Sequence, residues 1–149
     1  ERILREGMDR AVGLREIIAQ PQSEIPQFRA FLRRAGFVVT REDAVCEEGK
    51  HYFAMRAQPE REPGAAGAGG EEAGPGAGRE ACSRLYDLFG EHLLKARHPV
   101  LLAYLQQRKA CLGQLAASLE EAGSPRAGGR LDEVRGELAQ IEDALSWYG

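Results

Sequence analysis

One segment near the middle of the chain constrains the fold more than any other feature. All 22 residues from Pro59 to Glu80 are Gly, Ala, Pro, Glu or Arg, so none has an aliphatic side chain larger than alanine. Such a segment cannot bury enough apolar surface to offset the entropy of ordering its backbone. We therefore predict a flexible linker over residues 58–80, which separates a first part, residues 1–57, from a second part, residues 81–149.

The composition excludes several classes of protein. The 149 residues carry a net charge of −3 and contain no run of about 18 apolar residues that could cross a bilayer, and no signal-peptide pattern. The three cysteines lie far apart and form no C-x-x-C pair, which argues against a disulfide framework and a zinc site. None of the three histidines is spaced with other ligands as a metal site requires. We expect a cytoplasmic protein that binds neither membrane nor metal.

The start of the first part predicts a helix and then a buried strand. Residues 1–12 have helical apolar spacing, and Ile17–Ala19 form a short apolar run of the kind found in strands buried on both faces, as in a parallel sheet. A segment of 57 residues offers too small a core to stand alone. We therefore expect the C-terminal part of a longer α/β protein whose other strands precede Glu1. A small independent α+β unit is the alternative.

The rest of the first part predicts a helix followed by an antiparallel hairpin. Ser23 is a candidate N-cap for a helix with Pro26 in its first turn, and Gly36 follows the end of that helix. Two β-branched and aromatic runs, Phe37–Thr40 and His51–Arg56, predict strands on either side of a turn at Glu48-Gly49. The predicted order is helix, strand, helix, β-hairpin.

The second part has a helical pattern throughout. A short amphipathic stretch covers residues 83–94, and Pro99 is suited to the first turn of a longer helix. Two heptad-spaced seams then follow, formed by Leu101, Leu105, Leu112, Leu115, Leu119 and Ala122, and by Leu131, Val134, Leu138, Ile141, Leu145 and Tyr148. Residues 123–125 and Gly128-Gly129 are expected to break the helix between them. We predict an antiparallel coiled-coil hairpin, with a dimeric coiled coil as the alternative.

Gln20-Pro21-Gln22 is the first candidate binding site. It follows the carboxyl end of the predicted buried strand, and ligands of open α/β sheets bind outside such ends. An amide side chain there can both donate and accept hydrogen bonds to a base edge or an amine. A plain strand-to-helix turn would have the same spacing.

The second candidate is a basic region at the start of the helical part. From Ala81 to Lys109 there are five basic and two acidic side chains, a local net charge of +3. The basic residues are Arg84, Lys95, Arg97, Arg108 and Lys109. Such a patch can contact phosphates and bind nucleic acid in a salt-dependent way. A solvated helix face is the alternative interpretation.

Most of the chain resembles one known family. The matching positions are Gln20-Pro21, Arg29, Phe31-Leu32, Gly36-Phe37, Glu42, Glu47, Gly49-Lys50 and Tyr52, in this order and without gaps. Together they resemble the end of the catalytic domain in the TrmK family, bacterial tRNA adenine-N1 methyltransferases. Residues 85–148 are similar to the C-terminal helical domain of that family.

The resemblance implies the C-terminal part of a class I, Rossmann-like methyltransferase sheet followed by a helical hairpin. The whole protein would transfer a methyl group from S-adenosylmethionine to N1 of an adenine in tRNA. Separately from the resemblance, we expect a monomer without a metal. Its cofactor-binding and catalytic residues would lie upstream of Glu1, so this chain alone is expected to be inactive. Gln20 and Pro21 would line the substrate side of the pocket, and the hairpin would grip the tRNA.

Two positions depart from the family pattern. Gln22 stands where the family has Asn, which is one methylene shorter, and Phe53 stands where it often has Glu. The longer amide weakens the case for a specific base contact by Gln22. The alternative function is a non-enzymatic adaptor, in which the helical hairpin binds a protein partner.

Overall fold

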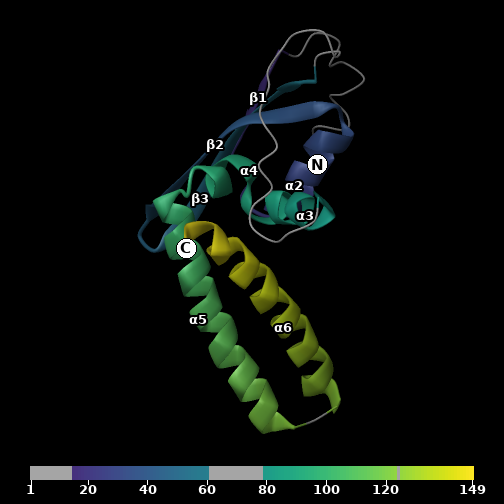
Figure 1. Ribbon diagram of the computed structural model, residues 1–149, viewed down its shortest axis with the longest axis vertical. Helices are drawn as coiled ribbons and strands as arrows, with labels where there is room; N and C mark the ends of the chain where they lie inside the picture. The colour runs from purple at the N-terminus through teal and green to yellow at the C-terminus, as the bar shows by residue number, and fades with distance from the viewer. Residues whose placement is uncertain (1–14, 61–78, 124) are drawn as a thin grey trace.

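The computed structural model describes residues 15–60, 79–123 and 125–149. The predicted helix over residues 1–12 and most of the predicted linker lie outside these ranges. A small sheet with helices packed on it forms one end of the molecule, and two long helices project from this end (Figure 1). The sheet unit comprises described residues before the predicted linker, and the helical part comprises described residues after most of it.

The sheet has three strands, β1 (Ile17–Ala19), β2 (Phe37–Glu47) and β3 (Lys50–Pro59). The strand order is β1-β3-β2, and β3 pairs antiparallel with both neighbours. β1 and β2 are therefore parallel to each other, and helix α2 (Ile25–Arg34) connects them across β3. The predicted order of strand, helix and hairpin is confirmed, with both strands of the hairpin longer than predicted.

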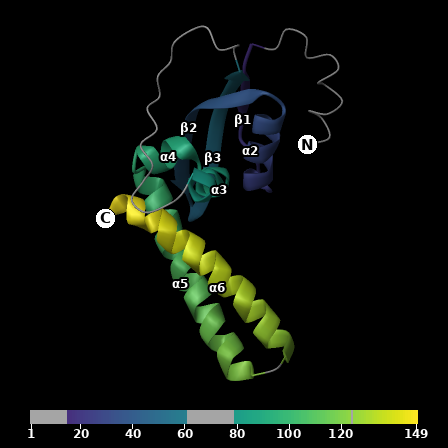
Figure 2. The same cartoon turned by 45° about the vertical axis from the view of Figure 1, so that its right-hand side comes forward.

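Only one face of this sheet is covered by the described helices. Phe53, Met55 and Ala57 alternate along β3 and are all buried on that face, Phe53 beneath the helical part and the other two beneath α2. Figure 2 shows α2 and the shorter helices gathered beside the sheet. Side chains of the opposite face, among them Val38 and Val45, are exposed.

In the described residues β1 is buried on one face only, whereas the prediction of burial on both faces concerned a longer protein with further strands. Ile17 packs beneath α2, but Ile18 points to the opposite face and is 73% exposed. The strand also lies at the edge of the described sheet, because β3 takes the place between β1 and β2. A run of three apolar residues cannot distinguish these two environments.

The start of α2 also differs from the expectation. The N-cap is Glu24, not Ser23, and no side chain caps the helix. Glu24 has a left-handed backbone, with φ 51° and ψ 37°, which is uncommon outside glycine. Pro26 lies in the first turn, as predicted, and Gly36 follows the end of the helix with φ 74°.

The turn between β2 and β3 is the one expected from its sequence. Glu48 and Gly49 have φ values of 49° and 76°. Positive φ at both central residues is typical of the two-residue turns that match the twist of a hairpin. The Glu48-Gly49 prediction is therefore confirmed.

The described residues of the second part form four helices and a short 3₁₀ turn. They are α3 (Arg79–Phe89), α4 (Glu91–Lys95), α5 (Pro99–Ala122), α6 (Pro125–Leu145) and η1 (Ser146–Tyr148). The predicted linker is too long at both ends, since β3 continues to Pro59 and α3 begins at Arg79. The prediction that Gly128 and Gly129 interrupt the helix is wrong. Both residues lie within α6, which begins at Pro125.

α5 and α6 pack against each other as an antiparallel hairpin. Three ion pairs show the direction: Arg108–Glu137 at 3.0 Å, Lys109–Glu142 at 2.9 Å and Glu120–Arg135 at 2.8 Å. Later residues of α5 thus face earlier residues of α6. The seam buries Leu105 and Leu112 against Val134 and Ile141. The predicted hairpin is present within a single chain.

Candidate functional site

The Gln20-Pro21-Gln22 segment lines a cavity at the carboxyl end of β1. The cavity has a volume of about 290 Å³ and lies between this segment and the first turns of α2. Both glutamine side chains are exposed, and neither has a hydrogen bond to the described residues. Their amide groups therefore have no competing partner among the described residues, and the binding role expected from the sequence stays a prediction.

A second cavity lies where the sheet unit meets the helical part. It has a volume of about 220 Å³, and its lining includes Arg29 from α2, Phe53 from β3, Phe89 from α3 and Tyr104 from α5. Ser23 and Glu24 line both cavities, so the two adjoin at the start of α2. No local sequence signal predicted this second cavity, because its walls come from four separate elements.

A buried ion pair joins the two parts of the chain. Arg29 Nε donates to Glu42 Oε1 at 2.8 Å, and the two side chains are 6% and 1% exposed. Arg29 Nη1 donates to the backbone carbonyl oxygens of Asp87 and Leu88 at 3.2 and 3.1 Å. One guanidinium thereby connects α2, β2 and the end of α3.

Glu42 faces this junction because of an irregularity in β2. The pairing with β3 shifts between Val39 and Arg41, which leaves Thr40 as an extra residue. An extra residue changes which side chains point inward beyond it. Glu42 therefore shares the covered face with Val39, whereas strict alternation would have placed Arg41 there.

Residues around Gly90 complete the junction. Glu42 Oε2 accepts a hydrogen bond from the backbone nitrogen of His92 at 3.1 Å, and His92 Nε2 lies 2.8 Å from the carbonyl oxygen of Val39. Gly90 has φ 94°, and a Cβ atom there would lie 2.5 Å from Glu42 Oε2. Glycine is thus required by both its backbone conformation and its close approach to the carboxylate.

Arg33 adds an outer ion pair on the solvent side of the junction. Its two terminal nitrogens donate to the two carboxylate oxygens of Asp87 at 2.6 and 2.8 Å. This bidentate hydrogen bonding raises the pKa of the Arg33 guanidinium above its ordinary value. The orientation of α3 relative to α2 is held from both the buried and the exposed side.

His98 orients the start of α5. Its Nδ1 accepts from the backbone nitrogen of Val100 at 3.3 Å, and its Nε2 lies 3.2 Å from Asp43 Oδ1. Both contacts are satisfied by the neutral ring that carries its proton on Nε2. Tyr148 Oη donates to the His98 carbonyl oxygen at 3.1 Å, and burial raises the pKa of Tyr148 to about 12.

The predicted basic patch separates into paired and unpaired side chains. Lys95 pairs with Glu91 at 2.7 Å, whereas Arg108 and Lys109 pair with glutamates of α6. Arg84 and Arg97 are exposed and have no ion pair with the described residues. Exposed ion pairs contribute little stability and exchange partners readily, so all five cations can still meet an anionic surface.

The described residues contain no group of three metal-ligating side chains. None of the helices in the same ranges combines the length and apolar character needed to cross a bilayer.

A family of known proteins matches nearly the whole chain. The match covers residues 1–143, and the family is described as TrmK, tRNA (adenine(22)-N(1))-methyltransferase. No curated protein matches.

Solved structures share the fold at low sequence identity. An uncharacterized protein from Listeria monocytogenes is 20% identical with a TM-score of 0.77, and covers 97% of this chain and 56% of its own length. The m1A22 tRNA methyltransferase TrmK of B. subtilis is 20% identical, with a TM-score of 0.71 and coverages of 97% and 57%. TrmK of M. capricolum, in complex with S-adenosylhomocysteine, is 11% identical, with a TM-score of 0.67 and coverages of 97% and 55%. The chain thus spans little more than half the length of these proteins.

Proposed function

Because the chain belongs to the TrmK family of tRNA (adenine(22)-N(1))-methyltransferases, we propose that the whole protein transfers a methyl group from S-adenosylmethionine to N1 of adenine 22 in tRNA. The family match over residues 1–143 is the observation that carries this proposal. The cavity after β1 and the projecting helical hairpin support it, because they provide a base-sized recess beside an elongated surface.

The described residues do not fit the methyl donor. Nucleotide-type ligands of α/β sheets bind at a glycine-rich turn after a strand. β1 is followed by Gln20-Pro21-Gln22, and β2 is followed by the Glu48-Gly49 hairpin turn. We therefore place the donor on residues outside the described ranges. The described residues would serve the other substrate, the RNA.

The cavity after β1 has the chemistry to hold the target adenine by the edge that does not react. A glutamine amide can accept from the N6 amino group of adenine and donate to N7. Gln20 and Gln22 present two such amides without competing partners in the described residues. An adenine held in this way keeps N1 free as the nucleophile. It must first leave its stack, as target bases of such enzymes do.

We propose that the basic side chains of the helical part contact tRNA phosphates. Arg84 and Arg97 support this role most directly, since neither has an ion pair with the described residues. Lys95, Arg108 and Lys109 would join them by leaving surface glutamates. We further propose that the protein acts in the cytoplasm as a monomer.

A salt titration tests the contact with tRNA. Changing Arg84 and Arg97 together to glutamine should weaken binding and reduce the slope of log K against log salt by roughly one unit for each lost phosphate contact. Arg34→Gln is the matched control, because Arg34 is also exposed and lacks an ion pair in the described part of the chain. An unchanged slope in the double variant would show that these cations are only a solvated face.

Methyl transfer from labelled S-adenosylmethionine to an unmodified tRNA transcript tests the function itself. The whole protein should label N1 of adenine 22, and a transcript with guanine at that position should remain unlabelled. A protein that labels neither transcript would contradict the proposal and favour the adaptor hypothesis.

A further inference from the structure

We propose that the cavity between α2, β3 and α5 binds a second nucleobase, that of the nucleotide next to the target adenine. This inference rests on the proposed function and extends it, because it assigns a ligand to a cavity that the methyl-transfer reaction itself does not require. The cavity is lined by the start of α2 and by Arg29, Phe53, Phe89 and Tyr104. It is called the flanking-base cavity below.

The size and walls of the flanking-base cavity suit a planar ring. Its volume is about 220 Å³, and an apolar cavity of about 150 Å³ is enough to take up benzene. Tyr104 is half-buried and meets Phe53 edge-on with ring centroids 5.4 Å apart. It also meets His51 edge-on at 5.3 Å. The aromatic ring of Tyr104 is thus fixed in place before a ligand arrives, as a stacking platform should be.

The polar groups of the cavity point to a base in particular. Arg29 Nε and Nη1 are occupied by hydrogen bonds, whereas Nη2 has none to the described residues and is therefore accessible, since no buried side-chain nitrogen in these ranges lacks a partner. Glu24 supplies a carboxylate that also lacks a partner in the described ranges. A nucleobase edge carries both acceptors and amino donors, so it can satisfy both groups. A phosphate would be repelled by Glu24, and an apolar ligand would leave both groups unpaired.

The position of Glu24 links this cavity to the one after β1. Glu24 and Ser23 line both, so two successive bases can be splayed apart on either side of them. The left-handed backbone of Glu24 is strained, and strain of this kind is concentrated at functional sites. Glu48 and Arg97 also have positive φ, but Glu48 lies in the hairpin turn and Arg97 directly follows the C-cap of α4, where such backbones are common. Glu24 has no such local requirement.

Binding of tRNA transcripts that carry 2-aminopurine tests the inference without the reaction. The probe is placed at the nucleotide on the 5′ side of adenine 22 in one transcript and on the 3′ side in another. Stacking on Tyr104 should change the fluorescence of one of the two on binding to the whole protein, and Tyr104→Leu should abolish that change. Tyr52→Leu is the control, since Tyr52 is half-exposed on β3 and has no aromatic contact in the described residues. A signal from neither transcript, or one that survives in Tyr104→Leu, would overturn the inference.

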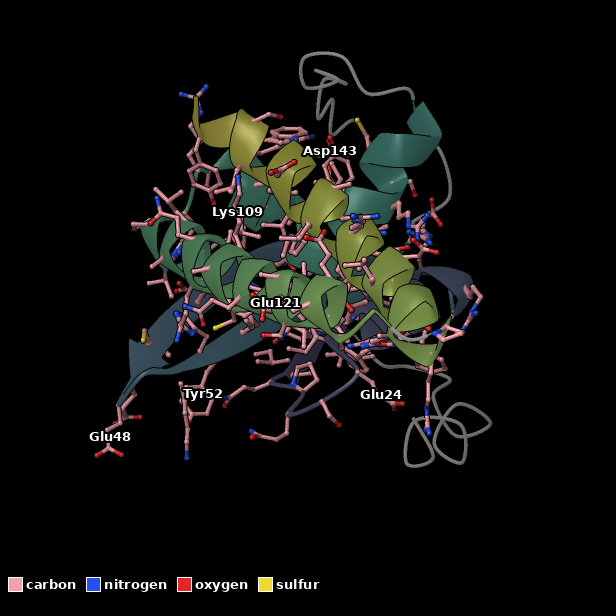
Figure 3. The ribbon with its side chains drawn as sticks, turned by 90° about the horizontal axis from the view of Figure 1, so that it is seen from below. Glu24, Glu48, Tyr52, Lys109, Glu121 and Asp143 are labelled. Atoms are coloured by element: carbon pink, nitrogen blue, oxygen red, sulfur yellow. The ribbon has the colours of Figure 1, made fainter. Side chains whose placement is uncertain are left out.

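A second variant avoids the packing change at Tyr104. Glu24→Gln keeps the shape of the side chain but removes its charge, and should lower kcat/KM for tRNA about 10-fold. On a transcript with an abasic residue at the flanking position, the kcat/KM of Glu24→Gln should equal that of the wild-type protein. Glu48→Gln is the matched control, and Figure 3 shows Glu48 at the far left of the view, well apart from Glu24. Equal loss by Glu24→Gln on both transcripts would contradict a contact with the flanking base.

Glu24→Gly separates a functional role from a structural one. Glycine adopts positive φ without strain, so this variant should unfold at a higher temperature than the wild-type protein while its kcat/KM for tRNA falls. If the wild-type protein methylates tRNA and the Tyr104 and Glu24 variants bind and methylate it equally well, the flanking-base cavity is refuted. The proposed function then remains intact. A protein that does not methylate tRNA would refute the proposed function first.

Discussion

The sheet unit and the helical part are stabilised in different ways. The core of the helical part contains eleven buried residues, and two of these, Ala44 and Phe53, come from the sheet. The core beneath α2 contains three buried residues among those that the structure describes, Leu32, Met55 and Ala57. The sheet unit therefore depends on contacts with its neighbour, whereas the helical hairpin has its own apolar seam.

The two regions also use charge differently. The junction buries its Arg29–Glu42 pair almost completely, and the pair makes three further hydrogen bonds, all to backbone groups around it. The ion pairs between α5 and α6 are all largely exposed. Removing one partner of a buried ion pair lowers the free energy of unfolding strongly, whereas removing one partner of an exposed pair changes it little. This contrast determines which of the following predictions concern large effects and which concern small ones.

The largest effect is expected from breaking the junction. Arg29→Met leaves the Glu42 carboxylate buried without its partner and should lower the free energy of unfolding by about 3–5 kcal/mol. Urea unfolding followed by the fluorescence of Trp147 measures this loss. Arg34→Met on the exposed side of α2 is the control and should change stability by less than about 0.5 kcal/mol. A loss below about 1 kcal/mol for Arg29→Met would show that the junction does not hold the two parts together.

A cavity in the hairpin seam should have the next largest effect. Leu105 is fully buried, and Leu105→Ala should cost about 2–5 kcal/mol of unfolding free energy. Leu115, on the same helix, is 38% exposed, and Leu115→Ala should cost clearly less. The same urea titration compares the two. Equal losses would mean that the seam is not the core of the helical part.

A smaller and pH-dependent effect is expected at Tyr148. Burial raises the pKa of its hydroxyl from 10.0 to about 12, so the folded state holds this proton more tightly than the unfolded state. The resulting stability is complete below pH 10 and is lost between pH 10 and 12. Because the side chain is partly exposed, we expect about 1 kcal/mol. Melting temperatures of wild type and Tyr148→Phe should converge over this range.

The smallest effect is expected from an exposed ion pair of the hairpin. Arg108→Ala removes the contact to Glu137 and should change the unfolding free energy by at most about 1 kcal/mol. Adding 1 M salt should reduce the difference from wild type further. A loss as large as that of Arg29→Met would erase the distinction between the two regions.

The sequence by itself determined the features that depend on local chemistry. Positive φ at Gly49, the proline at the start of α5 and the apolar spacing of the two long helices act within a few residues. The division around the Gly/Ala-rich segment also follows from composition alone. These features were predicted because neither turn geometry nor helical periodicity requires knowledge of distant residues.

Only the tertiary structure decided how the two parts meet. Arg29 is 13 residues from Glu42 and 58 from Asp87 in sequence, and Glu42 faces Arg29 because of the bulge at Thr40. The exposure of Ile18 was decided by which face the helices cover. The flanking-base cavity arises between elements up to 81 positions apart, Ser23 and Tyr104. Local patterns carry no signal for such contacts, because burial depends on which surfaces come together in the folded chain.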